Sequence, residues 1–179
     1  MNKIVAIVGM CGSGKSVACE YFESIGYKKI YFGGVTLEIL KEKNLEVTPE
    51  NEKIIRESLR KEHGMGAYAT VLLPKIEEEV KTNNVVLDGL YSWSELKILK
   101  DKFGDILSVI AITCDKNLRY ERISKREIRP LTNEEAIRRD TSEIENLEKG
   151  GPIAYADYYV LNNGTVLDFH NRLKEILNK

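Results

Sequence analysis

The segment that most constrains this chain runs from Gly9 to Ser16, Gly-Met-Cys-Gly-Ser-Gly-Lys-Ser, and fits the pattern G-x-x-x-x-G-K-[ST]. An apolar run, 4–8, precedes it and predicts a buried strand, and the segment that follows, 17–25, predicts a helix. Glycines within the loop let the backbone curl so that successive N–H groups point at one anion. The helix presents its positive N-terminal end to the same anion. Strand, loop and helix together predict a site for the phosphates of a nucleotide.

The same pattern assigns a role to each polar group of the loop. The ammonium of Lys15 is expected to reach the β- and γ-phosphates, and the hydroxyl of Ser16 is the expected ligand of Mg²⁺. The alternative is a chance match in a glycine-rich turn, which the flanking strand and helix make improbable. We therefore expect ATP and Mg²⁺ at this loop, bound by Gly9, Gly12, Ser13, Gly14, Lys15 and Ser16.

Composition excludes several other classes of protein. The 179 residues predict a single domain, 1–179, and the net charge of -1 gives no global basic field for nucleic acid. Three cysteines without a C-x-x-C pair favour neither a disulfide framework nor zinc, and they fit a reducing cytoplasm. Neither His63 nor His170 has a partner at metal-ligand spacing. No apolar run approaches the ~18 residues of a membrane span.

Strands and helices alternate along the chain. Strands are expected at 4–8, 27–32, 85–89, 106–113 and 158–161. Alternation of this kind implies parallel pairing through right-handed crossovers. The predicted fold class is therefore α/β, a three-layer P-loop NTPase fold with a five-stranded parallel sheet.

The helices carry start signals and candidate core positions. Thr48, Ser92, Asp115 and Thr132 are expected N-caps, and the second and fourth belong to capping boxes. Pro74 predicts a kink or a fresh start within 67–82, and a break is expected at 150–152. The positions expected to face the core are Ile54, Ile55, Ser58 and Leu59 on one helix and Ile137, Ile144 and Leu147 on another.

Asp88 ends an apolar strand and is followed by Gly89. A carboxylate at the carboxyl edge of such a strand faces the ligand crevice of an open α/β sheet. There it could hold Mg²⁺ through water or orient an acceptor hydroxyl. The alternative is an Asp in an ordinary turn at the end of a strand.

Four arginines crowd the stretch from 119 to 129. Arg122 and Arg126 are four residues apart, so a helix would point both guanidiniums the same way, where they could stabilise a transferring phosphoryl group. Arg119 is expected to face elsewhere. The alternative is a solvated basic face that pairs with Glu121 and Glu127.

Two segments have the properties of substrate-enclosing elements. Arginines on both flanks of an excursion, 127–138, predict a lid over phosphates, with Arg139 at its exit. The segment 33–65 inserts helices between two strands and could form an acceptor-binding arm, with Arg56 and Arg60 for a monophosphate. Exposed, salt-bridged helix charges are the alternative for each arginine.

The loop, the inserted helices, the strand ending in Asp-Gly, "ERISKRE" and "RRD" together resemble the nucleoside monophosphate kinase group, above all adenylate kinase and its relatives. Dephospho-coenzyme A kinase is similar in outline. The resemblance covers nearly the whole chain. It implies that Arg122 stacks on the nucleotide and that Arg126 and Arg139 contact phosphate. The closing "ADYYVLNNGT" resembles a final strand and base-contacting turn, which implies a role for Asn162.

The acceptor motifs of that group are rewritten here. Its Asp-Gly-Phe-Pro-Arg corresponds to Asp88-Gly89-Leu90-Tyr91-Ser92, so the acceptor-phosphate arginine is missing. Its Gly-Asp-x-x-Arg corresponds to the segment 34–38, Gly-Val-Thr-Leu-Glu, which lacks both charges. We retain Thr36 and Gly89 as the acceptor-binding positions of these two motifs.

The function that follows is transfer of the γ-phosphoryl group of MgATP to a nucleotide-like small molecule, with AMP as the first candidate. A regulatory ATPase or switch with weak transfer and a dephospho-coenzyme A kinase-like activity are alternatives. A nucleic-acid-processing kinase is less favoured, because the chain has no extended basic surface or aromatic stacking platform. The acceptor, the choice of ATP or GTP, the balance of transfer and hydrolysis, and the oligomeric state stay open.

Overall fold

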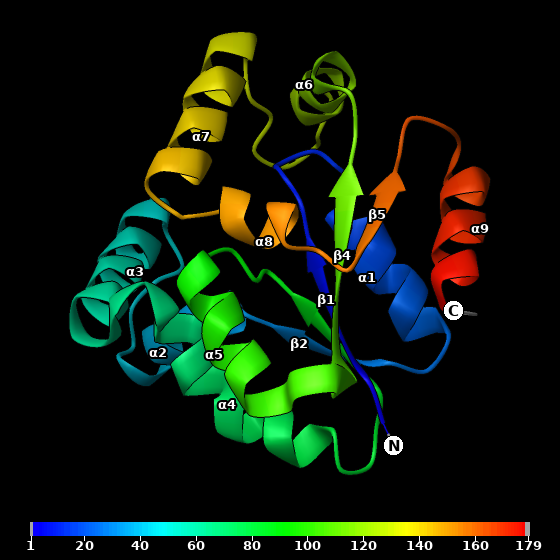
Figure 1. Ribbon diagram of the computed structural model, residues 1–179. Helices are drawn as coiled ribbons and strands as arrows, with labels where there is room; N and C mark the ends of the chain where they lie inside the picture. The colour runs from blue at the N-terminus through cyan, green and yellow to red at the C-terminus, as the bar shows by residue number, and fades with distance from the viewer. Residues whose placement is uncertain (1, 178–179) are drawn as a thin grey trace.

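The computed structural model describes residues 2–177, and its centre is a sheet of five parallel strands in the order β2-β3-β1-β4-β5 (Figure 1). Strand β1 lies in the middle and pairs with β3 on one side and β4 on the other. The predicted three-layer α/β fold with a five-stranded parallel sheet is confirmed. The strands are β1 Ile4–Val8, β2 Lys28–Tyr31, β3 Val85–Asp88, β4 Leu107–Thr113 and β5 Tyr158–Leu161.

Helices cover both faces of the sheet. Helices α1 and α9 pack on one face, and α4 and α5, with α2 and α3 beside them, pack on the other. Helices α6 and α7 stand at the end toward which the strand arrows point (Figure 1). The helices are α1 Lys15–Ser24, α2 Gly34–Glu42, α3 Pro49–His63, α4 Ala67–Glu79, α5 Trp93–Phe103, α6 Lys116–Ser124, α7 Asn133–Glu145, α8 Gly150–Ala154 and α9 Val166–Leu177, with 3-10 turns η1 Gly64–Gly66 and η2 Gly104–Ile106.

The central strand shows why the sequence before the loop is apolar without a gap. Ile4, Ala6 and Val8 belong to the core under α4 and α5, whereas Val5 and Ile7 belong to the core under α1 and α9. Successive side chains of a strand point to opposite faces, so a strand covered on both faces needs apolar residues at every position. This strand therefore delivers the loop of residues 9–16 to the carboxyl edge of the sheet in a fixed position. Within residues 2–177, no helix is long and apolar enough to cross a bilayer.

Three of the four predicted N-caps are confirmed. The Thr48 hydroxyl accepts a hydrogen bond from the Asn51 N–H group, and both capping boxes, at Ser92 and Thr132, are formed. The prediction for Asp115 is wrong in part, because it occupies the N-cap position of α6 but its side chain caps no N–H group.

Several core assignments on the peripheral helices are wrong. Ile55 and Leu59 are buried, but Ile54 and Ser58 are exposed, because α3 contacts the rest of the protein along one narrow stripe. On α7 the buried positions are Ala136 and Glu143, and the predicted Ile137 and Ile144 are 44% and 55% exposed.

Two predicted interruptions also differ. The segment 150–152 does not break the chain but starts the short helix α8. Pro74 lies inside α4, which continues through it as one helix, so the predicted fresh start is wrong and the predicted kink stays a prediction. The flanking Leu72 and Ile76 are buried, so packing on the sheet outweighs the local penalty of proline.

Candidate functional site

The glycine loop connects β1 to α1 and depends on glycine at each expected position. Gly9, Gly12 and Gly14 have φ angles of +147°, +83° and +103°, which side chains rarely adopt. A Cβ at Gly12 would lie 2.8 Å from the Ile123 side chain, and one at Gly14 would collide with the amide of Asn162. The loop therefore has the curled backbone that phosphate binding requires.

The polar groups of the loop fit an anion. The Lys15 ammonium donates to the carbonyl oxygen of Met10 at 3.0 Å, a neutral partner for a charged group. Burial, with the nearby Lys149, lowers the pKa of Lys15 to about 8, so this ammonium lacks sufficient negative charge around it. The Ser13 hydroxyl is buried and has no hydrogen-bond partner within the described part of the chain. A bound polyphosphate would supply negative charge to the Lys15 ammonium and a hydrogen-bond partner to the Ser13 hydroxyl.

Asp88 lies at the same edge of the sheet as the loop. It ends β3, opposite Ile7 of β1 in the strand register. Burial raises the pKa of its carboxyl, and Lys29 and Lys15 oppose that rise. Ser16 is exposed at the start of α1. No group of three or more His, Cys, Asp or Glu residues within 2–177 could hold a metal ion alone. Mg²⁺ would therefore need phosphate oxygens and water besides Ser16 and Asp88.

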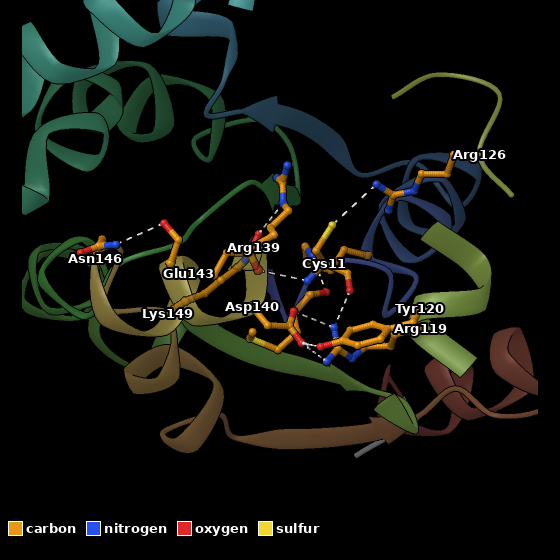
Figure 2. Close-up of polar contacts among 12 residues, drawn as sticks. Cys11, Arg119, Tyr120, Arg126, Arg139, Asp140, Glu143, Asn146 and Lys149 are labelled. Atoms are coloured by element: carbon orange, nitrogen blue, oxygen red, sulfur yellow. Dashed lines mark hydrogen bonds and ion pairs between the residues drawn. The ribbon is translucent and has the colours of Figure 1, made fainter. Parts of the chain in front are cut away.

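The orientation of the Arg119 side chain differs most from what the sequence predicted. It is buried, and its guanidinium donates to the Cys11 carbonyl oxygen at 2.8 Å and to both carboxylate oxygens of Asp140, at 3.0 and 2.6 Å (Figure 2). The Tyr120 hydroxyl donates to the same carboxylate at 3.0 Å. The expectation that Arg119 faces away from the site is wrong. It joins α6, α7 and the P-loop.

Arg122 and Arg126 both lie beside the site, but not on one helical face. Helix α6 ends at Ser124, so Arg126 belongs to the following loop and the predicted shared face is wrong. The Arg126 guanidinium points to the sulfur of Cys11 at 3.6 Å (Figure 2). The Arg122 guanidinium donates to the carbonyl oxygen of Asn162 at 2.9 Å.

The side chain of Asn162 supports the P-loop. Its amide donates to the Ser13 carbonyl oxygen at 2.9 Å, and the residue is buried. A hydrogen bond over 149 residues of separation ties the end of β5 to the loop after β1. The expected contact of this turn with a nucleotide base stays a prediction.

A cavity of about 790 Å³ lies beside the carboxyl edge of the sheet. Its lining comes mainly from α2, α3, α7 and the segments after β2 and β3, with single residues from α4, α5 and the loop before α7, and it includes aromatic rings and four arginines. That volume lies in the range of small-molecule sites, about 300–1,000 Å³. All five residues predicted to bind the acceptor line this one cavity, namely Thr36, Arg56, Arg60, Gly89 and Arg139.

Charges in this cavity are partly paired. Glu52 on α3 accepts from Arg56 at 3.1 Å and from Arg129 at 3.3 Å. Arg129 belongs to the 125–132 loop between α6 and α7, so this pair connects the predicted lid to the predicted acceptor arm. Arg60 lies 6.0 Å from the centre of the Tyr68 ring. The sequence did not single out Glu52, and nothing in its helical pattern marks it as a bridge.

A buried ion pair that the sequence did not indicate joins Lys149 Nζ to Glu143 Oε2 at 2.7 Å. The same oxygen accepts from the Cys11 N–H group at 3.1 Å, and Oε1 accepts from Arg139 Nε at 3.2 Å (Figure 2). Burial alone would raise the pKa of Glu143, but Lys149 and Lys15 outweigh it and lower that pKa. The sequence offered no signal for this pair, because the apolar spacing of Ile137 and Ile144 pointed to another face of α7.

Comparison with known proteins agrees with this geometry. A family model described as an AAA domain matches residues 5–146. A UPF0200 protein of Sulfurisphaera tokodaii is 34% identical over 182 residues, which cover 99% of this chain and 97% of that protein. The chain belongs to the UPF0200 family. An Archaeoglobus fulgidus relative named UPF0200/UPF0201 protein is 36% identical over 99% of this chain, but the match spans only 55% of that longer protein.

Two solved kinase structures have the same fold as this UPF0200 protein. A shikimate kinase from Bacteroides thetaiotaomicron has a TM-score of 0.62 at 12% identity and is covered over 99% of each chain. A dephospho-CoA kinase from Campylobacter jejuni has a TM-score of 0.55 at 19% identity and is covered over 99% of this chain and 96% of its own. The predicted resemblance to P-loop nucleotide kinases is confirmed as a shared fold. The roles of 33–65 as an acceptor arm and 127–138 as a lid stay predictions.

Proposed function

We propose that this protein transfers the γ-phosphoryl group of MgATP to a nucleotide-like small molecule bound in the 790 Å³ cavity, with AMP as the first candidate. The observation that carries the proposal is the position of that cavity. Its lining includes Gly89, which directly follows Asp88 at the edge where the P-loop lies. A donor bound at the loop and an acceptor bound in the cavity would meet there.

The chemistry of the lining supports an anionic, aromatic acceptor. Arg60 and Arg139 line the cavity, and guanidinium forks match phosphate oxygens. Tyr31, Tyr68 and Tyr91 supply aromatic surface beside them. A purine or similar ring carrying one phosphate combines these two requirements.

The transfer itself requires placement and charge more than covalent help from the protein. An acceptor phosphate oxygen forms a bond to the γ-phosphorus, the bond from that phosphorus to the β-γ bridging oxygen breaks, and two ADP molecules result when AMP accepts. Lys15 and Arg126 would neutralise charge on the moving group. Mg²⁺, held through Ser16 and Asp88, would neutralise charge on the β- and γ-phosphates. Closure of the 127–138 segment would exclude water.

A coupled assay of ADP formation tests the proposal, with AMP, a coenzyme A precursor or water as the acceptor. We expect AMP to raise ADP formation well above the rate in water alone. Arg60→Ala should raise the KM for AMP, because a charge-assisted contact of this kind contributes about 1.5–3 kcal/mol. Lys61→Ala, at the exposed neighbouring position on α3, is the matched control. A rate that depends on ATP but on none of the acceptors contradicts the proposal.

A regulatory ATPase is the second candidate, and one observation favours it. The position of the missing acceptor arginine is held by Ser92, whose side chain caps α5 and donates to the Met65 carbonyl oxygen. That position therefore serves helix α5 rather than an acceptor phosphate. ATP hydrolysis unaffected by any monophosphate would favour this function.

A further inference from the structure

Glu143 and Lys149 form an ion pair that the proposed transfer does not use. Both residues are buried, with side chains 4% and 2% exposed. Full burial of two charges is costly, and such pairs persist where other polar groups complete their hydrogen bonding. Here Arg139 Nε completes one carboxylate oxygen of Glu143, Oε1, and a P-loop group completes the other.

That group is the N–H of Cys11, the third residue of the loop, which donates to Glu143 Oε2 at 3.1 Å. Backbone N–H groups of a P-loop bind the oxygens of a polyphosphate. One carboxylate oxygen of Glu143 thus receives both a P-loop N–H group and the Lys149 ammonium. This is the set of partners that a phosphate oxygen would take.

The two members of the pair are held differently. Lys149 sits in the turn after α7, where its N–H group donates to the Glu143 carbonyl oxygen at 3.2 Å and its ammonium lies 4.4 Å from the centre of the Tyr91 ring. The preceding Glu148, at φ 53°, anchors this turn by accepting from the Ser94 N–H group at 3.0 Å. The Glu143 carboxylate is held by Lys149, by the Cys11 N–H group and by Arg139 Nε, and the Arg139 side chain lies on the same helix and is 50% exposed. Glu143 can therefore turn toward solvent together with Arg139, whereas Lys149 belongs to a turn that is anchored to α5 through Ser94.

We propose that Lys149 is a second lysine of the phosphate site and that the Glu143 carboxylate stands in for the terminal phosphate of a bound polyphosphate. On binding, that phosphate takes the Cys11 N–H group and the Lys149 ammonium, and Glu143 turns away. Two anions on one oxygen position repel each other, whereas a buried ammonium left alone is strongly unfavourable. Exchange of one anion for another avoids both costs. The inference uses only the phosphate-binding part of the proposed function.

Binding measurements on the full-length protein test this, with two probes: MgATP, and tripolyphosphate, which carries the phosphates without a base. Glu143→Gln should lower the Kd for both probes about tenfold, or 1.4 kcal/mol, because it removes the competing negative charge. Lys149→Met should raise both Kd values by at least a similar factor. Glu145→Gln, the same charge change at an exposed position of α7, should stay within about twofold of wild type.

The opposite signs separate a phosphate site from a structural pair. A merely structural role would make Glu143→Gln and Lys149→Met weaken binding in parallel with their melting temperatures, and that result overturns the inference. So does a Glu143→Gln protein that matches the Glu145→Gln control. Should Lys149→Met fail to fold, the double variant Glu143→Gln, Lys149→Met leaves no unpaired buried charge. It should bind at least about tenfold more weakly than Glu143→Gln alone.

These outcomes are distinct from failure of the proposed function. If the variants show the predicted changes in Kd but wild-type protein leaves AMP unphosphorylated, AMP is refuted as the acceptor and the inference is supported. Wild-type protein and Glu143→Gln protein that both bind neither MgATP nor tripolyphosphate would overturn the inference.

Discussion

Replacement of Arg119 should lower the free energy of unfolding more than replacement of any exposed arginine near the site. Arg119 donates through two nitrogens to the two oxygens of Asp140 and also to the Cys11 carbonyl oxygen. The side chains of the pair are only 8% and 13% exposed. Arg119→Ala leaves the Asp140 carboxylate partly buried with only the Tyr120 hydroxyl among these partners.

The expected magnitude follows from that geometry. Removal of one partner from a buried ion pair costs about 3–5 kcal/mol, a large share of the roughly 5–15 kcal/mol that stabilises a typical domain. For a chain of this size the melting temperature should fall by about 6–20 °C. Arg119→Lys should recover little, because an ammonium cannot reproduce the planar two-pronged donor.

Urea denaturation followed by circular dichroism measures the effect, and a double-mutant cycle with Asp140→Asn isolates the pair. We expect the double variant to be more stable than the sum of the single losses predicts, by about 0.5–3 kcal/mol. Arg138→Ala, at an exposed position of α7, is the control and should change stability by less than about 0.5 kcal/mol. A loss below 1 kcal/mol for Arg119→Ala, or additive single losses, would refute this reasoning.

Three further predictions concern charge at the site. Lys15→Ala should abolish MgATP binding by calorimetry at an unchanged melting temperature; retained affinity would contradict the phosphate role of the loop. Arg126→Ala should lower kcat about 10³-fold with little change in KM for ATP, and Arg126→Lys should rescue poorly; unchanged kcat would return Arg126 to an ordinary surface role. Burial by itself would raise the pKa of the Asp140 carboxyl, but the hydrogen bonds and charge of Arg119 and the Tyr120 hydroxyl outweigh it, so the pKa is lowered. Asp140 therefore stabilises the fold above its ordinary pKa of 3.8, and this contribution is lost as pH falls through its lower folded value. The difference in unfolding free energy between wild type and Asp140→Asn should shrink over that acid range in urea titrations; a constant difference would contradict the assignment.

Local sequence signals predicted the sheet and the P-loop well. Ile4–Val8 is apolar at every position, so only a strand covered on both faces accommodates it. The three glycines of the loop have positive φ angles that their spacing anticipated. The capping boxes at Ser92 and Thr132 act within four residues, and both formed. Interactions between residues so close along the chain can be predicted from the sequence alone.

Short-range sequence signals did not predict which residues of the peripheral helices are buried. The apolar spacing of Ile137 and Ile144 predicted the wrong face of α7, because that helix turns Ala136 and Glu143 toward the P-loop. The sequence could not show which face would find a partner. That choice depends on where α6 and the loop of residues 9–16 lie in space.

The sequence by itself determined the phosphate-binding loop, the parallel sheet and the collection of arginines near the site, because each depends on residue type and short spacing. Only the tertiary structure decided which charges pair. It joined Arg119 to Asp140 across 21 residues and Glu143 to the Cys11 N–H group across 132. The physical reason is that a charge removed from water must find its partner within a few ångströms, and the folded chain brings such partners together from any distance along the sequence.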